Sequence, residues 1–403
     1  MEKLQPKLRF PEFKGDWENK NIGEITNVTA GGTPSTLNKD YWNGNIKWMN
    51  SGDLNLKRVF EVQNRITELG LKKSSTKFIP KNSILIGLAG QGKTRGTVAM
   101  NMVELCINQS IGAILPNNEL FFSDFLYHNL DNRYDELRGL STGDGGRGGL
   151  NLSIIKNLNI ILPSLEEQTR IANFLSSVDE KINILREKKS LLEDYKKGIM
   201  QKIFNQEIRF KDDNGNDFED WKIKTLGEVG NVLNGLTYSP DDISEDGVLV
   251  LRSSNIKDNR LKFDDNVYVN KNNFTAVVEN DILICVRNGS RNLIGKNTLI
   301  TKEIEGVAFG AFMSVFRSNF NRFLIHWFGS GNFFENVNLN LGATINSING
   351  SDLKKFKIPF PSIEEQTKIA TFLSAIDEKI ELVSNQIQDT HEYKKGLLQQ
   401  MFV

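Results

Sequence analysis

The sequence predicts an α+β protein built as a tandem duplication. Two domains of mixed helix and strand would alternate with two long helices that pair antiparallel about a pseudo-twofold axis. Three observations lead to this prediction: the chain is long enough for two or three domains, one block of residues recurs almost unchanged, and apolar residues repeat every seven positions behind each copy of that block.

The composition is that of an ordinary globular protein. The chain has 403 residues, 50 Lys and Arg against 50 Asp and Glu, and 39% hydrophobic residues. A net charge of zero excludes a uniformly basic nucleic-acid coat but allows local basic loops. No apolar run has the length of a membrane helix, the N-terminus lacks the apolar core of a secretory signal, and Cys106 and Cys285 form no disulfide framework. We therefore expect a cytoplasmic protein.

The repeated block defines the architecture. Residues 163–182 and 361–380 are identical at fifteen of twenty positions, at an offset of 198 residues. The same offset relates Phe204 to Phe402, and weaker similarity continues upstream of both blocks. A period of this length gives domain-sized units rather than the short repeats of a solenoid. We expect two mixed domains and two helices in the order 1–162, 163–208, 209–360 and 361–403.

The mixed domains show short apolar runs bounded by Gly and Asn, which predict buried strands. We expect such strands at residues 83–86, 248–251 and 282–286, and one helix in each domain, at residues 121–137 and 320–337.

The two helices are predicted from their caps and their periodicity. Ser164 with Glu167, and Ser362 with Glu365, fit the capping box, in which the hydroxyl and the carboxylate each satisfy a backbone donor. About 40 residues follow each cap, or roughly 60 Å of helix. Core helices seldom run this far, so two unrelated core helices are the weaker alternative. The sustained heptads indicate a coiled-coil seam, formed by Ile171, Val178, Leu185, Leu192 and Ile199 in the first helix and by Ile369, Ile376, Val383 and Leu397 in the second.

These residues carry a family resemblance. The duplicated segment Pro-Ser-x-Glu-Glu-Gln-Thr-x-Ile-Ala-x-Phe-Leu, with residues 31–35 (GGTPS) and Tyr41-Trp42, resembles the specificity subunit of type I restriction–modification systems over essentially the whole chain. The resemblance implies that each mixed domain is a target-recognition domain that reads one half of a split, asymmetric site on double-stranded DNA. It also implies that the helices set the spacing and dock two methyltransferase subunits.

The resemblance further implies that this subunit is not an enzyme and holds no cofactor. S-adenosylmethionine, ATP and Mg would belong to the two methyltransferase subunits and two endonuclease/translocase subunits, which carry out DNA methylation and restriction.

Two loops at equivalent positions are candidates for reading DNA. Each leaves a buried strand and is rich in Gly, Lys, Arg, Asn or Gln, yet the two differ in sequence, as two readers of different half-sites should. Arg can pair bidentate with guanine, and Asn or Gln with adenine. A solvated turn or a phosphate contact remains the alternative for any one residue. The candidates are Gln91, Lys93, Thr94 and Arg95, with Arg147 from a second Gly-rich loop, and Arg287, Asn288, Arg291 and Asn292.

Two other functions remain open from the residues. Residues 87–94 (GLAGQGKT) satisfy the phosphate-loop pattern of an ATPase, but Gly96 and β-branched residues follow where a helix should begin. A stand-alone bipartite DNA-binding regulator is the second alternative. No metal site is expected, because His128 and His326 have no Cys or His neighbours at ligand spacing; both should pack or cap.

Overall fold

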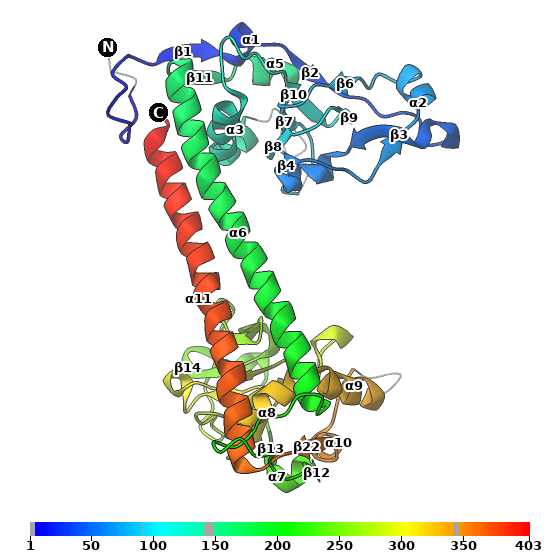
Figure 1. Cartoon of the computed structure of the whole chain (residues 1–403), viewed down its shortest axis with the longest axis vertical. Helices are drawn as coiled ribbons and strands as arrows, with labels where there is room; N and C mark the ends of the chain where they lie inside the picture. The colour runs from blue at the N-terminus through cyan, green and yellow to red at the C-terminus, as the bar shows by residue number, and fades with distance from the viewer. Residues whose placement is uncertain (1–4, 91, 141–148, 342–345) are drawn as a thin grey trace. The chain divides into compact units, whose positions relative to one another are not determined.

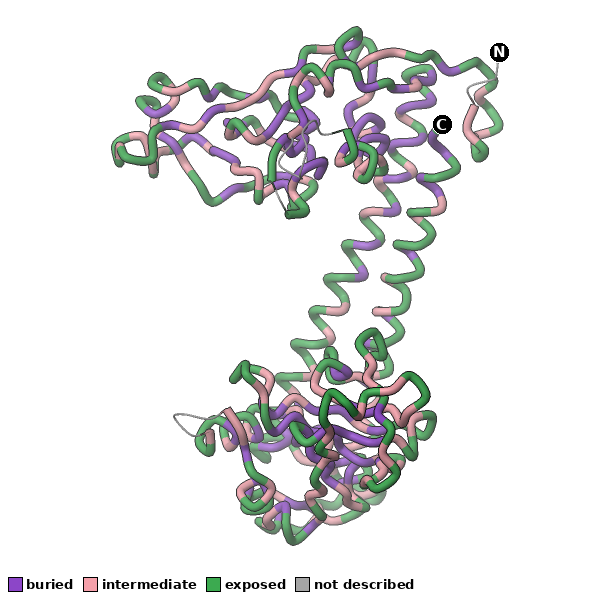
Figure 2. Tube along the Cα trace, turned by 180° about the vertical axis from the view of Figure 1, so that it is seen from behind, coloured by how far each residue is buried: buried purple, intermediate pink, exposed green. Residues whose placement is uncertain are grey.

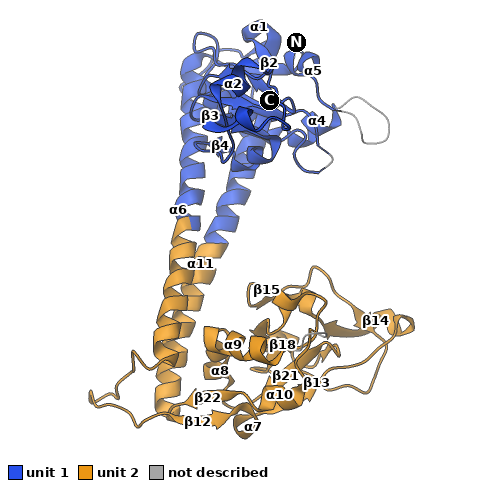
Figure 3. Ribbon diagram, turned by 90° about the vertical axis from the view of Figure 1, so that its right-hand side faces the viewer, with its two compact units in different colours: residues 1–186, 385–403 blue, residues 187–384 orange. Residues whose placement is uncertain are grey.

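The computed structural model describes residues 5–90, 92–140, 149–341 and 346–403. The chain divides into two compact units (Figure 3), which we call unit 1 (residues 1–186 and 385–403) and unit 2 (residues 187–384). The division cuts both long helices. Each unit therefore contains one mixed domain, the first half of the helix that follows it, and the last part of the helix from the other copy.

The mixed domain of unit 1 has a five-stranded sheet of order β2-β10-β7-β8-β4, a four-stranded sheet of order β5-β3-β9-β6 and the pair β1-β11. Most ladders are antiparallel, but β3 with β9 and β4 with β8 are parallel. The elements are β1 Glu18–Asn21, α1 Ile22–Ile25, β2 Val28–Ala30, η1 Lys39–Tyr41, β3 Trp42–Met49, η2 Ser51–Leu56, β4 Arg58–Val59, β5 Arg65–Ile66, α2 Glu68–Lys72, β6 Phe78–Ile79, β7 Ile84–Gly87, β8 Val98–Asn101, β9 Leu105–Ile107, β10 Ile111–Ile114, α3 Ser123–Asn132, α4 Tyr134–Gly139, α5 Leu152–Lys156 and β11 Asn159–Leu162.

Unit 2 repeats this plan with sheets of order β13-β21-β18-β19 and β17-β14-β20 and with the pairs β12-β22 and β15-β16. The elements are β12 Lys222–Thr225, α7 Leu226–Val229, β13 Asn231–Asn234, η4 Pro240–Asp242, β14 Ile243–Leu251, η5 Ser253–Asn255, β15 Ile256–Lys257, β16 Arg260–Leu261, β17 Tyr268–Val269, β18 Ile282–Cys285, η6 Arg291–Leu293, β19 Asn297–Leu299, η7 Lys302–Ile304, β20 Ala308–Phe309, β21 Met313–Arg317, α8 Asn321–Phe328, α9 Gly331–Asn340, α10 Gly350–Lys354 and β22 Lys357–Phe360.

The two long helices are confirmed (Figure 1): α6 spans Leu165–Phe204 and α11 spans Ile363–Met401. Within each unit, the start of one helix packs beside the end of the other, so the two run antiparallel. Lys394 near the end of α11 pairs with Asp179 of α6 in unit 1, at 2.6 Å, and Lys196 near the end of α6 pairs with Asp377 of α11 in unit 2, at 2.5 Å.

The core of each unit is shared between the domain and the helices. In unit 1, Phe125 of α3 packs on Phe402, with ring centroids 5.3 Å apart, and in unit 2 Phe323 of α8 packs on Phe204 at 5.8 Å. Figure 2 shows buried residues concentrated in the sheets and on one face of each helix. Because Phe204 and Phe402 are equivalent in the repeat, each domain buries the last turn of the other copy's helix.

The predicted strands are confirmed as β7, β14 and β18, but the prediction of one helix per domain is wrong. Two helices replace it in each case: α3 and α4 in unit 1, α8 and α9 in unit 2. In unit 2 the break follows from Ser330, whose hydroxyl accepts a hydrogen bond from the Phe333 amide and so caps a new helix.

The predicted capping boxes are half right. The Ser164 and Ser362 hydroxyls accept hydrogen bonds from the Glu167 and Glu365 amides, both at 3.3 Å. The carboxylates, however, accept hydrogen bonds from arginine side chains instead of from the cap backbone. A charged guanidinium is the stronger donor for a buried carboxylate.

Within the described ranges, none of the helices combines the length and the apolar character that crossing a membrane requires.

Candidate nucleic-acid interface

The two candidate loops lie at equivalent places in the two domains. The first loop, residues 88–97, connects β7 to β8, and the second loop, residues 286–296, connects β18 to β19. β7 is also paired with β10, and β18 with β21, so each loop leaves a central, fully buried strand. A buried strand holds the base of its loop in place while the tip stays in solvent.

The first loop is held by helix α4. The Tyr134 hydroxyl donates to the Lys93 carbonyl at 3.1 Å, and the Arg138 guanidinium donates to the Gly92 carbonyl at 2.7 Å. Lys93 is exposed and Thr94 is half-buried, but Arg95 is only 8% exposed. The loop therefore leaves Lys93 and part of Thr94 open to solvent, while Arg95 is directed into the protein.

Two of the sequence candidates, Gln91 and Arg147, lie outside the described residues.

The phosphate-loop alternative requires a helix that begins in the loop, and the described part of the loop has none. In the part of this loop that is described, residues 88–90 and 92–97, no helix begins: a turn leads directly into β8 at Val98. A phosphate loop places phosphates at a helix N-terminus, where backbone N–H groups converge on the anion. Lys93 is thus an exposed cation in the loop of the β7–β8 hairpin.

The second loop is braced by neighbouring turns. The Asn288 amide donates to the Ser253 hydroxyl at 3.1 Å, and the Arg287 amide N–H donates to the Phe312 carbonyl at 3.1 Å. The Arg287, Arg291 and Asn292 side chains are exposed, and Asn288 is half-buried. The backbone is therefore held while at least three polar side chains face solvent.

The exposed cations of both loops are free of carboxylate partners within the described part of the chain. Lys93, Arg287 and Arg291 form none of the ion pairs there, whereas the nearby Arg252 pairs with Asp265 at 2.9 Å. An unpaired cation on a braced loop can bind phosphate or a base edge without first breaking an internal bond. These loops are the local basic elements that a neutral chain can carry.

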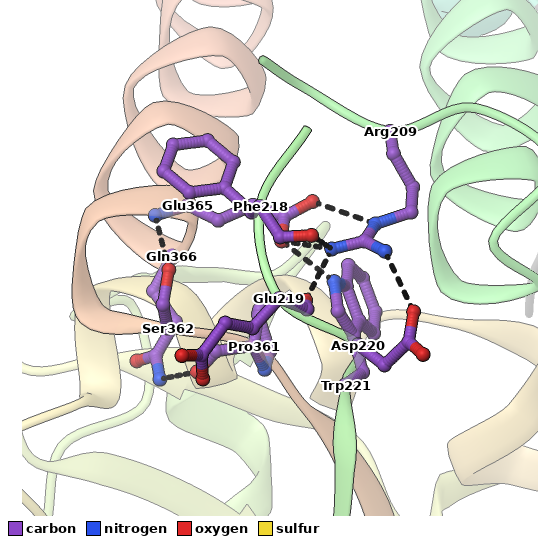
Figure 4. Close-up of polar contacts among 9 residues, drawn as sticks. All are labelled: Arg209, Phe218, Glu219, Asp220, Trp221, Pro361, Ser362, Glu365 and Gln366. Carbon is purple, nitrogen blue, oxygen red and sulfur yellow. Dashed lines mark hydrogen bonds and ion pairs between the residues drawn. The ribbon is translucent and has the colours of Figure 1, made fainter. Parts of the chain in front are cut away.

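A second set of polar contacts joins each domain to its long helix (Figure 4). In unit 2 the Glu365 carboxylate accepts hydrogen bonds from Arg209, at 2.9 and 3.2 Å, and from the Trp221 indole, at 2.8 Å. In unit 1 Arg9 reaches Glu167 in the same way, at 2.7 and 2.8 Å. Sequence reasoning missed this pair, although the repeated dipeptides Arg9-Phe10 and Arg209-Phe210 were a signal for it.

The equivalent histidines, His128 and His326, also join each domain to its long helix. His326 of α8 is hydrogen-bonded to the Ser374 hydroxyl of α11 at 3.4 Å, and His128 of α3 to the Ser176 hydroxyl of α6 at 3.2 Å. Both rings are buried, and burial is the main reason that their pKa values lie below the ordinary value. The packing role predicted for them is confirmed. Among the residues described, no cluster of three or more His, Cys, Asp and Glu side chains could hold a metal ion.

The predicted seam positions lie on the inward faces of α6 and α11. Seven of the nine are buried, and Leu192 and Ile199 are half-buried against the core of unit 2. The seven are Ile171, Val178, Leu185, Ile369, Ile376, Val383 and Leu397.

The comparison with protein families identifies the domain. Residues 14–194 and 218–390 both match the model of the type I restriction modification DNA specificity domain. The chain belongs to this family. It carries two specificity domains in tandem, which makes it a DNA sequence-recognition subunit.

Relatives within the family support the same assignment. The MjaVIII specificity subunit of Methanocaldococcus jannaschii is 24% identical over 97% of this chain and 92% of its own length. The MjaIX specificity subunit of the same organism is 30% identical, but the match spans 55% of this chain and only 53% of that relative. The S subunit of a type I restriction–modification system from M. genitalium has the same fold, with a TM-score of 0.58 at 19% identity over 99% of both chains.

Proposed function

We propose that the two mixed domains, residues 1–162 and 209–360, each read one half of a bipartite, asymmetric site on double-stranded DNA. The first loop would contribute Gln91, Lys93, Thr94 and Arg95, together with Arg147, and the second would contribute Arg287, Asn288, Arg291 and Asn292. The observation that carries the proposal is a contrast within the repeat: the helix starts, residues 163–182 and 361–380, are identical at fifteen of twenty positions, whereas the loops on equivalent strands diverge. A repeated frame with different polar loop tips suits one DNA geometry and two base sequences.

Exposure supports some of these candidates more than others. Lys93, Arg287, Arg291 and Asn292 are exposed, which favours a direct contact with DNA, whereas the buried Arg95 side chain is better suited to hold the shape of the first loop.

We further propose that the helices dock two methyltransferase subunits, which carry the catalytic activity, S-adenosylmethionine and, with endonuclease/translocase subunits, ATP and Mg. Exposed apolar side chains on the helices support this. Unit 1 presents Ile184 and Tyr393, and unit 2 presents the equivalent Leu382 and Tyr195, each more than half exposed. Because the repeat supplies the same pair twice, the surface suits two copies of one partner.

The proposal is tested by mapping methylated adenines in cells that carry this chain with its methyltransferase subunit. We expect one bipartite motif with two unlike halves. Lys93→Ala should alter only one half and Arg291→Ala only the other. Loss of a base contact should remove about 1–3 kcal/mol of discrimination between bases. Loss of a phosphate contact should instead weaken binding to all sequences alike and lower its salt dependence. Failure to co-purify with any methyltransferase subunit would favour the stand-alone regulator.

A further inference from the structure

Phe312 is an aromatic side chain in an unusual place. It directly precedes β21, at the end of the sheet that carries the second loop, and the residue is 57% exposed. Its carbonyl accepts hydrogen bonds from the Val286 and Arg287 amides, at 3.0 and 3.1 Å. The backbone beside the loop is therefore braced, while the ring faces solvent and is not used to fill the core.

The Phe312 ring lies against a cation of the proposed reading loop. The Arg287 guanidinium carbon lies 5.8 Å from the ring centroid. Arg287 is exposed and has no carboxylate partner among the residues that the structure describes. A ring that packs beside a guanidinium restricts its rotamers without using its N–H groups, so the donors remain available to a ligand.

This pair exists in only one of the two domains. Ser110 occupies the position of Phe312 in unit 1, since its carbonyl accepts from the Leu88 amide just as that of Phe312 accepts from Val286. Strand β10 then begins at Ile111, as β21 begins at Met313. In the first loop, the residue equivalent to Arg287 is Ala89. Both members of the pair are therefore replaced together, which is expected of side chains that act on the same ligand feature.

We propose that Arg287 and Phe312 form one composite reader of a thymine next to a guanine in the second half-site. The guanidinium would donate to O6 and N7 of the guanine, and the ring would contact the C5-methyl group of the thymine in the major groove. A separation of 5.8 Å allows the two side chains to reach adjacent base pairs, which rise by about 3.4 Å. This inference rests on the proposed function, because it requires the second domain to read DNA.

The thymine methyl group provides a direct test. Once the target is mapped, the complex of the full chain with its methyltransferase subunits is titrated with duplexes in which each thymine of the second half-site, on either strand, is replaced in turn by deoxyuridine. Deoxyuridine lacks only the methyl group. We expect one replacement to weaken binding about fourfold, the value of one methyl group removed from water.

Variants assign that loss to the ring. Phe312→Ala should bind the thymine and deoxyuridine duplexes equally, whereas Phe312→Leu, which keeps an apolar contact, should retain the difference. Arg287→Lys keeps the charge but loses the bidentate fork, so its preference for the neighbouring guanine should fall about tenfold or more. Ile223→Ala is the matched control, because Ile223 is an equally exposed apolar residue on β12, in a different sheet.

Three results would overturn the inference. The first is that no thymine replacement in the second half-site weakens binding, and the second is that Phe312→Ala still distinguishes the thymine and deoxyuridine duplexes. The third is that Phe312→Ala or Arg287→Lys weakens binding to all sequences by the same factor. If the wild-type complex shows no sequence preference in the second half-site at all, the proposed function itself fails, and that result is seen before any variant is made.

Discussion

A carboxylate without access to solvent needs hydrogen-bond donors for both of its oxygen atoms. Glu365 is completely buried and finds these donors on Arg209 and Trp221. The interaction with Glu365 is the main reason that the pKa of Arg209 lies above its ordinary value. The same arrangement of Arg9 and Glu167 ties the N-terminal segment of the first domain to the start of α6. These contacts orient each domain on its own helix.

Removing this carboxylate should destabilise unit 2. We expect Glu365→Ala to lower the free energy of unfolding by about 3 kcal/mol, because Arg209 and the Trp221 indole lose their buried acceptor. Urea unfolding measures the change. Asp217→Ala removes an exposed ion pair with Lys211 and should change little. An equally small effect for Glu365→Ala would show that the pair does not hold the junction.

The buried histidines predict a pH dependence. Burial, and secondarily the charge of Lys196, lower the pKa of His326 to about 3. Asp377 lies 3.9 Å from the ring, but its charge is matched by Lys196. Since an unfolded histidine titrates near pH 6.5, the unfolded chain binds more protons between these two pH values. The free energy of unfolding therefore keeps its full value above pH 6.5 and decreases as the pH drops toward 3.

The expected loss is about 1.4 kcal/mol per pH unit for each such histidine. Urea midpoints recorded from pH 7 to pH 5 should decrease accordingly, and His326→Gln should make the slope shallower. A His326→Gln chain with an unchanged slope would assign the pH dependence to other groups.

At the scale of the elements, the seams of the two long helices differ in polarity at one position. Thr390 of α11 is 8% exposed, and its hydroxyl donates to the Gln386 carbonyl at 2.6 Å. The first copy has Leu192 at the equivalent position, and apolar residues are what a seam normally buries. A pocket lies beside it, lined by Val178, Lys181, Asp389, Thr390 and Tyr393.

Filling this pocket should stabilise unit 1. We expect Thr390→Leu to raise the free energy of unfolding by about 1 kcal/mol, because additional apolar surface is buried without crowding. The matched reverse change, Leu192→Thr in unit 2, should lower the free energy of unfolding by a similar amount. Thermal unfolding of the two variants measures both changes. Destabilisation by both variants would show that Thr390 already fits its site better than leucine.

At the scale of the whole molecule, each unit is completed by the other copy's helix. Phe402 packs on Phe125, and its equivalent Phe204 packs on Phe323. A chain cut after Ile208 should therefore lack the contacts that the end of α11 makes in unit 1. The ends of the two helices are alike, since residues 195–198 match residues 393–396 and Phe204 matches Phe402. A second copy of residues 1–208 can therefore supply equivalent side chains.

We expect the fragment 1–208 to dimerise and, with its methyltransferase subunits, to direct methylation to a palindrome of the first half-site. Its mass in solution and methylation mapping provide the measurements. Phe204→Ala in the fragment is the control and should weaken the dimer, since this ring would replace Phe402 against Phe125. A folded fragment that remains monomeric at high concentration would contradict the exchange of helix ends.

Local patterns alone were enough for much of this architecture. The duplication follows from identity at a constant offset, and the long helices follow from apolar residues every seven positions, both of which are visible without knowing any contact. The central strands follow from short apolar runs such as that at β18. The placement of the candidate loops was predictable too, because each directly follows such a strand.

The contacts and burial that only the tertiary structure reveals depend on residues far apart in the chain. The partner of Glu365 is Arg209, and the neighbour of Arg287 is Phe312. Arg95 resembles a surface arginine in the sequence, yet it is buried, because burial depends on which elements cover a residue. The exchange of helix ends between the two copies also has no local signature. Two similar heptad series could pair in other ways, and only the packing of Phe402 on one domain and Phe204 on the other selects this one.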